Sequence, residues 1–76
     1  MKAEIVTSQF TVMADGYQID ICYNFNANML EGYVDGQCIM NATFNPARVV
    51  LSYSNILHMA VELLKVHHLK IDRNGI

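Results

Sequence analysis

Hydrophobic and polar residues alternate along the first half of the chain. The alternation is most regular from residue 17 to residue 25, where one face carries Tyr17, Ile19, Ile21, Tyr23 and Phe25. The intervening residues are Gln18, Asp20, Cys22 and Asn24. A period of two is typical of a strand with one buried face, so this segment is predicted to be a half-buried strand.

Two Asp-Gly pairs divide the first half into hairpins. Asp15-Gly16 and Asp35-Gly36 suit two-residue type I′ turns, in which both residues need positive φ. The first turn pairs Ala14 with Tyr17 and aligns the apolar residues of both strands on one face, as Val12 with Ile19 and Phe10 with Ile21. The second turn pairs Val34 with Gln37, Gly32 with Ile39 and Leu30 with Asn41.

The connection between the hairpins leaves the register open. The connection runs through Asn26, Ala27 and Asn28 and can close as a two-residue or a three-residue loop, and a shift of one residue reverses every side chain. The longer loop would place Glu31 beside Tyr23 within the apolar face, which is costly for an unpaired carboxylate. We therefore expect the shorter loop, with Phe25 beside Leu30 and Ile21 beside Val34.

A single long helix is predicted after the strands. Asn45 is a suitable N-cap, Pro46 suits the first helical position, and neither glycine nor proline recurs before Gly75. The expected helix spans about 46–68, and 70–76 has the composition of a frayed end. Its apolar stripe consists of Val49, Val50, Tyr53, Ile56, Leu57, Ala60, Val61, Leu63 and Leu64.

These elements predict an α+β fold in one domain, residues 1–76, with strands within about 3–44. Four antiparallel strands form a meander, and one C-terminal helix packs on one face (ββββα). One helix covers one face of a sheet, so the other face is expected to stay open. With the expected register, that open face carries Tyr33, Met40, Glu31, Asn24 and Met29, which we predict to bind a partner protein. Leu51, Met59 and Val66 lie outside the helix stripe and are candidates for self-association.

Composition supports contact with other proteins over contact with nucleic acids. The hydrophobic class makes up 53% of the 76 residues, more than so small an interior needs, whereas charged residues make up 16%. Lys and Arg together number 5 and the net charge is −2, so few groups are present to neutralise phosphates.

Candidate chemistry along the chain is sparse. Cys22 and Cys38 are expected to be about two strand spacings apart, too far for a disulfide, and to stay reduced. His58 and Glu62 are four residues apart, but two ligands do not make a metal site. No nucleotide-binding or hydrolase motif occurs. We therefore expect no enzyme activity, cofactor or metal.

The start of the chain and its hydrophobic runs bear on location. Glu4 interrupts any apolar signal core, and no run of about 20 apolar residues could span a bilayer. Together with the two reduced cysteines, this favours a cytoplasmic protein that does not enter a membrane.

The expected function is a small non-enzymatic protein-binding module, an inhibitor or adaptor that blocks a surface of a larger target. The ββββα layout is similar to that of small phage-encoded inhibitors of bacterial defence, such as anti-CRISPR proteins, and more loosely to antitoxin domains. The alternatives are a homo-oligomeric structural domain and a protein that binds nucleotides or single-stranded nucleic acid through stacking on Tyr33.

Overall fold

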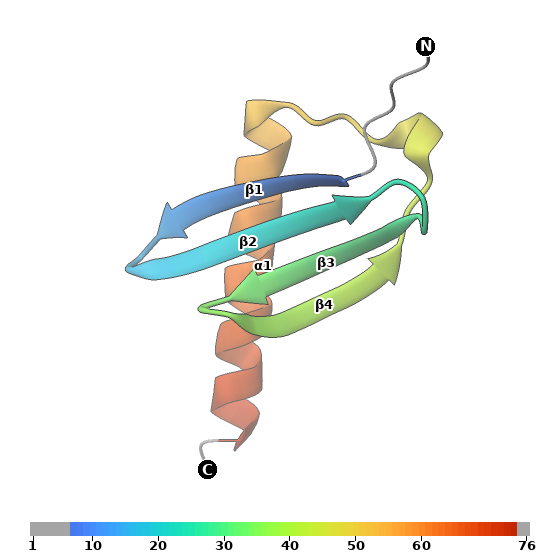
Figure 1. The fold of residues 1–76 in the computed structure, drawn as a ribbon. Coiled ribbons are helices and arrows are strands. Elements are labelled where there is room, and N and C mark those ends of the chain that lie inside the picture. The colour runs from blue at the N-terminus through green and yellow to red at the C-terminus, as the bar shows by residue number, and fades with distance from the viewer. Residues whose placement is uncertain (1–6, 75–76) are drawn as a thin grey trace.

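The computed structural model describes residues 7–74, and residues 3–6 of the expected first strand lie outside this range. One antiparallel sheet contains β1 (Thr7–Ala14), β2 (Tyr17–Asn24), β3 (Met29–Val34) and β4 (Gln37–Thr43), in the order β1-β2-β3-β4. The helix α1 (Tyr53–Asn74) follows and crosses all four strands on one face (Figure 1). The predicted α+β fold, ββββα, is confirmed.

Both Asp-Gly turns have the predicted geometry. The φ angles are 51° and 82° at Asp15 and Gly16, and 48° and 81° at Asp35 and Gly36, as a type I′ turn requires. The first hairpin has the expected register throughout, from Ala14 opposite Tyr17 outward. The turn residues thus determined the pairing of β1 with β2.

The loop between β2 and β3 is longer than predicted. Asn24 pairs with Met29, which leaves four residues, 25–28, in the turn. The Asn24 side chain accepts hydrogen bonds from the backbone N–H groups of Asn26 and Ala27, both at 3.0 Å, and Asn28 adopts a φ of 53°. These local bonds favour the four-residue loop. The register moves by two residues relative to the prediction, so each side chain keeps its face but changes its neighbours.

A β-bulge in β4 makes the register of the second hairpin differ from the predicted one. Val34 pairs with Gln37 as predicted, but beyond the irregularity at Gly32 and Tyr33 the pairing shifts by one residue, and Gly32 faces Met40. The shift turns the rest of β4 over. Met40 and Ala42, expected on the open face, therefore lie on the helix side of the sheet, and Asn41 and Thr43 take the open face.

The helix begins and ends later than predicted. Asn45 and Pro46 start only a short 3-10 turn, Pro46–Arg48, in which the Asn45 side chain accepts the Ala47 N–H at 3.0 Å. Residues 49–52 are not helical. The cap of α1 is Ser52, whose hydroxyl accepts the Asn55 N–H at 3.2 Å. At the other end α1 continues to Asn74, so most of the expected frayed tail is helical.

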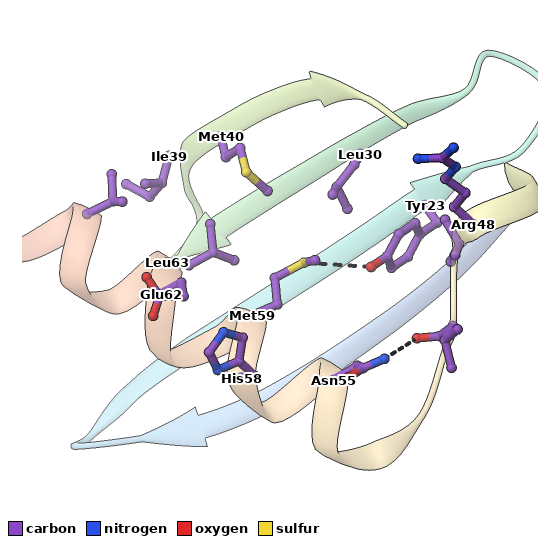
Figure 2. A pocket seen from close by; sticks show the side chains of 13 residues that line it. Tyr23, Leu30, Ile39, Met40, Arg48, Asn55, His58, Met59, Glu62 and Leu63 are labelled. Carbon is purple, nitrogen blue, oxygen red and sulfur yellow. Dashed lines mark hydrogen bonds between the residues drawn. The ribbon is translucent and has the colours of Figure 1, made fainter. Parts of the chain in front are cut away.

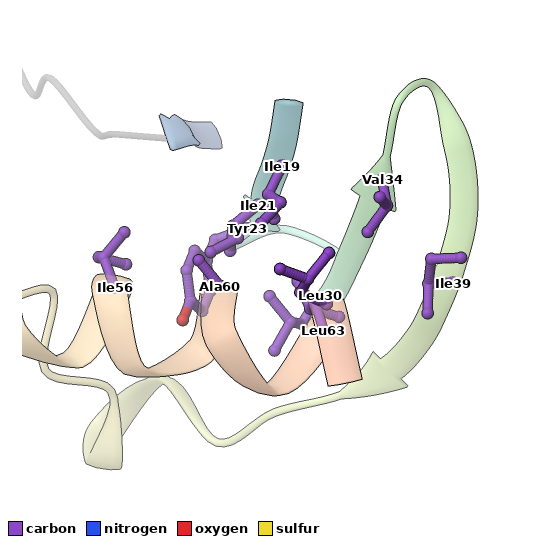
Figure 3. Close-up of a cluster of buried hydrophobic side chains, with 10 residues drawn as sticks. Ile19, Ile21, Tyr23, Leu30, Val34, Ile39, Ile56, Ala60 and Leu63 are labelled. Carbon is purple, nitrogen blue, oxygen red and sulfur yellow. The ribbon is translucent and has the colours of Figure 1, made fainter. Parts of the chain in front are cut away.

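The core lies between α1 and the helix side of the sheet (Figure 3). Its largest fully buried side chains are Ile19, Ile21 and Val34, and they meet a helix face of Ile56, Ala60, Leu63 and Leu64. Gly32 allows the close approach, because a Cβ at this position would lie 2.6 Å from Leu63 Cδ2. The core thus occupies the middle of the sheet.

Candidate functional site

An apolar groove lies on the helix side of the sheet, with a volume of about 560 Å³. Figure 2 shows α1 along one wall and the sheet residues Leu30 and Met40 opposite. Its lining comes from β2, β3, β4, the 46–50 segment and α1, and consists of Tyr23, Leu30, Ile39, Met40, Arg48, Val49, Val50, Asn55, His58, Met59, Glu62, Leu63 and Val66. We call this hollow the groove.

Two hydrogen bonds hold the walls of the groove. The Tyr23 hydroxyl donates to the Met59 sulfur at 3.7 Å, which ties the sheet to α1. The Asn55 side-chain amide donates to the Val50 carbonyl at 3.1 Å, which ties the first turn of α1 to the segment before it (Figure 2). Val49 and Val50 of the non-helical segment 49–52 therefore form part of the groove wall.

The rim of the groove is polar. Arg48, His58 and Glu62 are exposed there, and Glu62 forms an ion pair with Lys65 at 3.5 Å. The interior presents flexible thioethers from Met40 and Met59, both half-buried. An apolar floor with a polar rim is the pattern of a surface that takes up apolar side chains from a partner.

The open face of the sheet is a polar surface with its own hydrogen bonds. Thr11 donates to Asp20 at 2.7 Å, Gln18 donates to the second oxygen of Asp20 at 3.1 Å, and Tyr33 donates to Glu31. Across the strands, Glu31 lies between Cys22 and Asn41, not between Asn24 and Met40 as expected. The neighbouring side chains therefore satisfy both acids of this face.

The acids change the titration of their neighbours. The hydrogen bond from Tyr33 to Glu31, with smaller contributions from desolvation and charge, raises the pKa of Tyr33 to about 12. Burial, followed by the charges of Glu31 and Asp20, raises the pKa of the Cys22 thiol. A raised pKa keeps this thiol protonated, the opposite of what a nucleophilic cysteine needs.

The predicted partner-binding residues do not share one surface. Met29, Glu31, Tyr33 and Asn24 lie on the open face, whereas Met40 packs against the core from the helix side. The placement of Met40 was wrong because the bulge in β4 is not visible in a strict alternation. The Asn24 side chain is engaged in the turn after β2. Whether the four residues of the open face contact a partner stays a prediction.

The predicted self-association residues also separate. Met59 and Val66 line the groove, and Met59 is half-buried instead of fully exposed. Leu51 precedes α1 and lies beside β1, at the other edge of the sheet from the groove. The prediction that Leu51 belongs to the helix was wrong, because α1 begins at Tyr53.

Among the side chains that the structure describes, those of residues 7–71, no three His, Cys, Asp or Glu gather as potential metal ligands. Cys22 and Cys38 are free thiols. The three basic side chains that the structure describes, Arg48, Lys65 and Lys70, come from the 3-10 turn and α1, so none lies on the open face with Tyr33. None of the helices described is both long enough and apolar enough to span a membrane.

The groove was not predicted from the sequence, although two local signals mark it. Ile39 and Met40 are adjacent apolar residues in a strand that otherwise alternates, which is a sign of a bulge. Val49 and Val50 are β-branched and precede Ser52, a good N-cap, which indicates an extended segment and a later helix start.

Comparison of the chain with protein-family models, with curated proteins and with solved structures finds no match. Function is therefore argued from the geometry of these surfaces.

Proposed function

We propose that the protein is a small non-enzymatic protein-binding module, an inhibitor or adaptor that acts by occupying a surface of a larger protein. The observation that carries this proposal is the open apolar groove between α1 and the β3–β4 half of the sheet. Its volume of about 560 Å³ falls within the roughly 300–1,000 Å³ of pockets that bind small molecules, and its lining is predominantly apolar.

The chemistry of the groove suits a protein partner. Met40 and Met59 adapt their shape to an incoming side chain, and Tyr23 adds a large aromatic surface with a polar end. The exposed Arg48 at the rim has no acidic partner among the described residues, so it is available to a carboxylate of the partner. We expect the partner to insert apolar anchors flanked by an acid.

Two valines of α1 offer a matched test of the groove. Val66 lines the groove and is 39% exposed, whereas Val61 is 46% exposed and lies outside the lining. Val66→Glu places a charge in the apolar lining of the groove, and Val61→Glu adds the same charge elsewhere on α1. We expect the first variant to lose binding and the second to retain it, since a desolvated unpaired charge is costly.

The measurement begins with affinity capture from lysate of the source cells and identification of the captured protein by mass spectrometry. Binding of that purified protein to the wild type and to both variants is then measured by calorimetry. Equal binding by the two variants would exclude the groove as the contact surface.

A third variant, Tyr33→Ala, tests the open face by itself. Because Tyr33 and Met40 lie on opposite faces, changing them together would not separate the two surfaces. If Tyr33→Ala lost binding to the partner while Val66→Glu kept it, the contact surface would be the open face and not the groove.

A further inference from the structure

The two edge strands of the sheet differ in how they are protected. β4 is interrupted by a bulge, and the Lys70 ammonium from α1 donates to the Ile39 carbonyl at 3.1 Å, inside the irregular stretch. Bulges and lysines at an edge are devices that prevent another strand from pairing with it. The outer edge of β4 is therefore blocked near its centre.

β1 carries none of these devices. It is a regular strand of eight residues, Thr7–Ala14, that pairs with β2 without a register shift and contains neither proline nor any charged residue. Among residues 7–74, no other strand or backbone hydrogen bond covers its outer edge. A long, uncharged and regular edge is a template for another strand.

The hairpin register identifies the free groups of β1. A two-residue turn makes Ala14 and Tyr17 a hydrogen-bonded pair, and such pairs alternate along an antiparallel ladder. The backbone groups of Gln9, Thr11 and Met13 consequently point away from β2. Their N–H and C=O groups form a row of donors and acceptors that can bond to a strand outside the chain.

The helix side of this edge is also incompletely covered. Phe10 and Val12 of β1 are half-buried, whereas their partners in β2, Ile21 and Ile19, are fully buried. A second hollow of about 560 Å³ lies beside them, where Leu51, Tyr53 and Leu57 also line the wall. Tyr53 at this hollow is 82% exposed.

We propose that β1 pairs antiparallel with β1 of a second copy of this chain, forming a two-fold dimer with one continuous eight-stranded sheet. Self-pairing suits β1 because the strand carries no charge that would meet a like charge across the two-fold axis. It also matches the side-chain pattern. Since only the odd-numbered residues face outward, they pair with one another, and the apolar Phe10 and Val12 of both copies fall on the same face.

The dimer has a defined shape. A two-fold axis perpendicular to the sheet places both helices on one side and leaves the edge of each β4, with its Lys70 cap, at the outside. The sheet then ends at two protected edges, so the assembly closes at two copies. Tyr53 and Leu51 of each copy lie next to the junction and are expected to become less exposed.

A pair of proline variants tests the proposal. Gln9 and Asn41 are both exposed residues of the open face, one on each edge strand, and the register points the backbone N–H of each away from the sheet. Proline removes that N–H without removing an internal ladder bond. We expect the wild type and Asn41→Pro to have twice the chain mass of 8.6 kDa in sedimentation equilibrium, and Gln9→Pro to have the mass of one chain.

Amide hydrogen exchange locates the contact in the wild type. In the proposed dimer the amides of Gln9, Thr11 and Met13 are protected, and dilution to the monomer removes their protection. A wild type that stays monomeric at high concentration would overturn the proposal. A wild-type dimer whose Gln9, Thr11 and Met13 amides exchange freely would also overturn it. So would a Gln9→Pro variant that is folded by circular dichroism and still dimeric. The outcome is independent of the groove, which lies on the other half of the sheet.

Discussion

The two faces of the sheet are built from the same strands but depend on different interactions. On the helix side, Ile19, Ile21 and Val34 are fully buried. On the open side, the neighbours Asp20 and Tyr33 are half-buried and are held by hydrogen bonds to Thr11 and Glu31. The packing against α1 therefore stabilises the fold, whereas the open face satisfies its polar groups locally and contributes little to stability.

The largest expected effect comes from removing a core side chain. Ile21→Ala removes a fully buried side chain beneath α1, and we expect it to lower the free energy of unfolding by about 2–5 kcal/mol. A domain of this length has roughly 4–11 kcal/mol in total, so the loss is a large fraction. Unfolding in urea, followed by circular dichroism at one fixed protein concentration, measures it.

The adjacent residue provides the control for this comparison. Cys22 follows Ile21 in β2 but points to the open face, and we expect Cys22→Ala to cost less than about 1 kcal/mol. If Cys22→Ala destabilised the protein as much as Ile21→Ala, the open face would be packed, and the contrast between the faces would be lost.

A smaller effect is expected where the two layers approach most closely. A methyl group at Gly32 would meet the Leu63 side chain at 2.6 and 2.7 Å, and Leu63 is itself buried. We expect Gly32→Ala to destabilise the fold by about 1–3 kcal/mol through overpacking. Thermal unfolding monitored by circular dichroism measures the change.

A double-mutant cycle identifies the cause of that loss. If Gly32→Ala acts through Leu63, then Leu63→Ala should cost less in the Gly32→Ala background than in the wild type. Additive effects would show instead that the loss arises from the backbone of β3. Gly36→Ala is a useful contrast, since its added methyl group would meet nothing within 4 Å but its φ of 81° disfavours a side chain.

The parts of the fold that were predictable depend on local chemistry. Asp15-Gly16 and Asp35-Gly36 determine the turn type, and the alternation in β2 determines which side chains face α1. These signals lie within a few residues of the structure they specify. The ββββα order and the existence of an open face follow from them.

The remaining features depend on competition between local signals. Asn45-Pro46 suits a 3-10 turn as well as an α-helix, and Ser52 supplies a second cap seven residues after Asn45. The bulge that turns Met40 toward α1 lies opposite Gly32 and Tyr33, and a strict alternation continued from the Asp35-Gly36 turn does not include it. The groove results from both features, so alternation and helical periodicity could not locate it.

The smallest effect expected from the comparison concerns titration on the open face. Because the folded chain keeps Tyr33 protonated up to a pKa of about 12, and a tyrosine in an unfolded chain ionises near pH 10, the Tyr33–Glu31 pair favours folding below about pH 10. That contribution disappears as the pH rises from about 10 to about 12. Glu31→Gln removes the carboxylate charge and should lower the Tyr33 pKa toward its ordinary value. The chemical shift of the Tyr33 ring carbon that bears the hydroxyl, followed by NMR from about pH 9 to about pH 13, measures the pKa.

Tyr23 makes this measurement specific to the open face. Its pKa is raised by burial on the helix side, so Glu31→Gln should leave the titration of Tyr23 unchanged while it shifts that of Tyr33. If both tyrosines shifted together, the substitution would have disturbed the packing beneath α1, and the two faces would be coupled. If neither shifted, the Tyr33–Glu31 hydrogen bond would not persist in solution, and Tyr33 would be free to contact a partner.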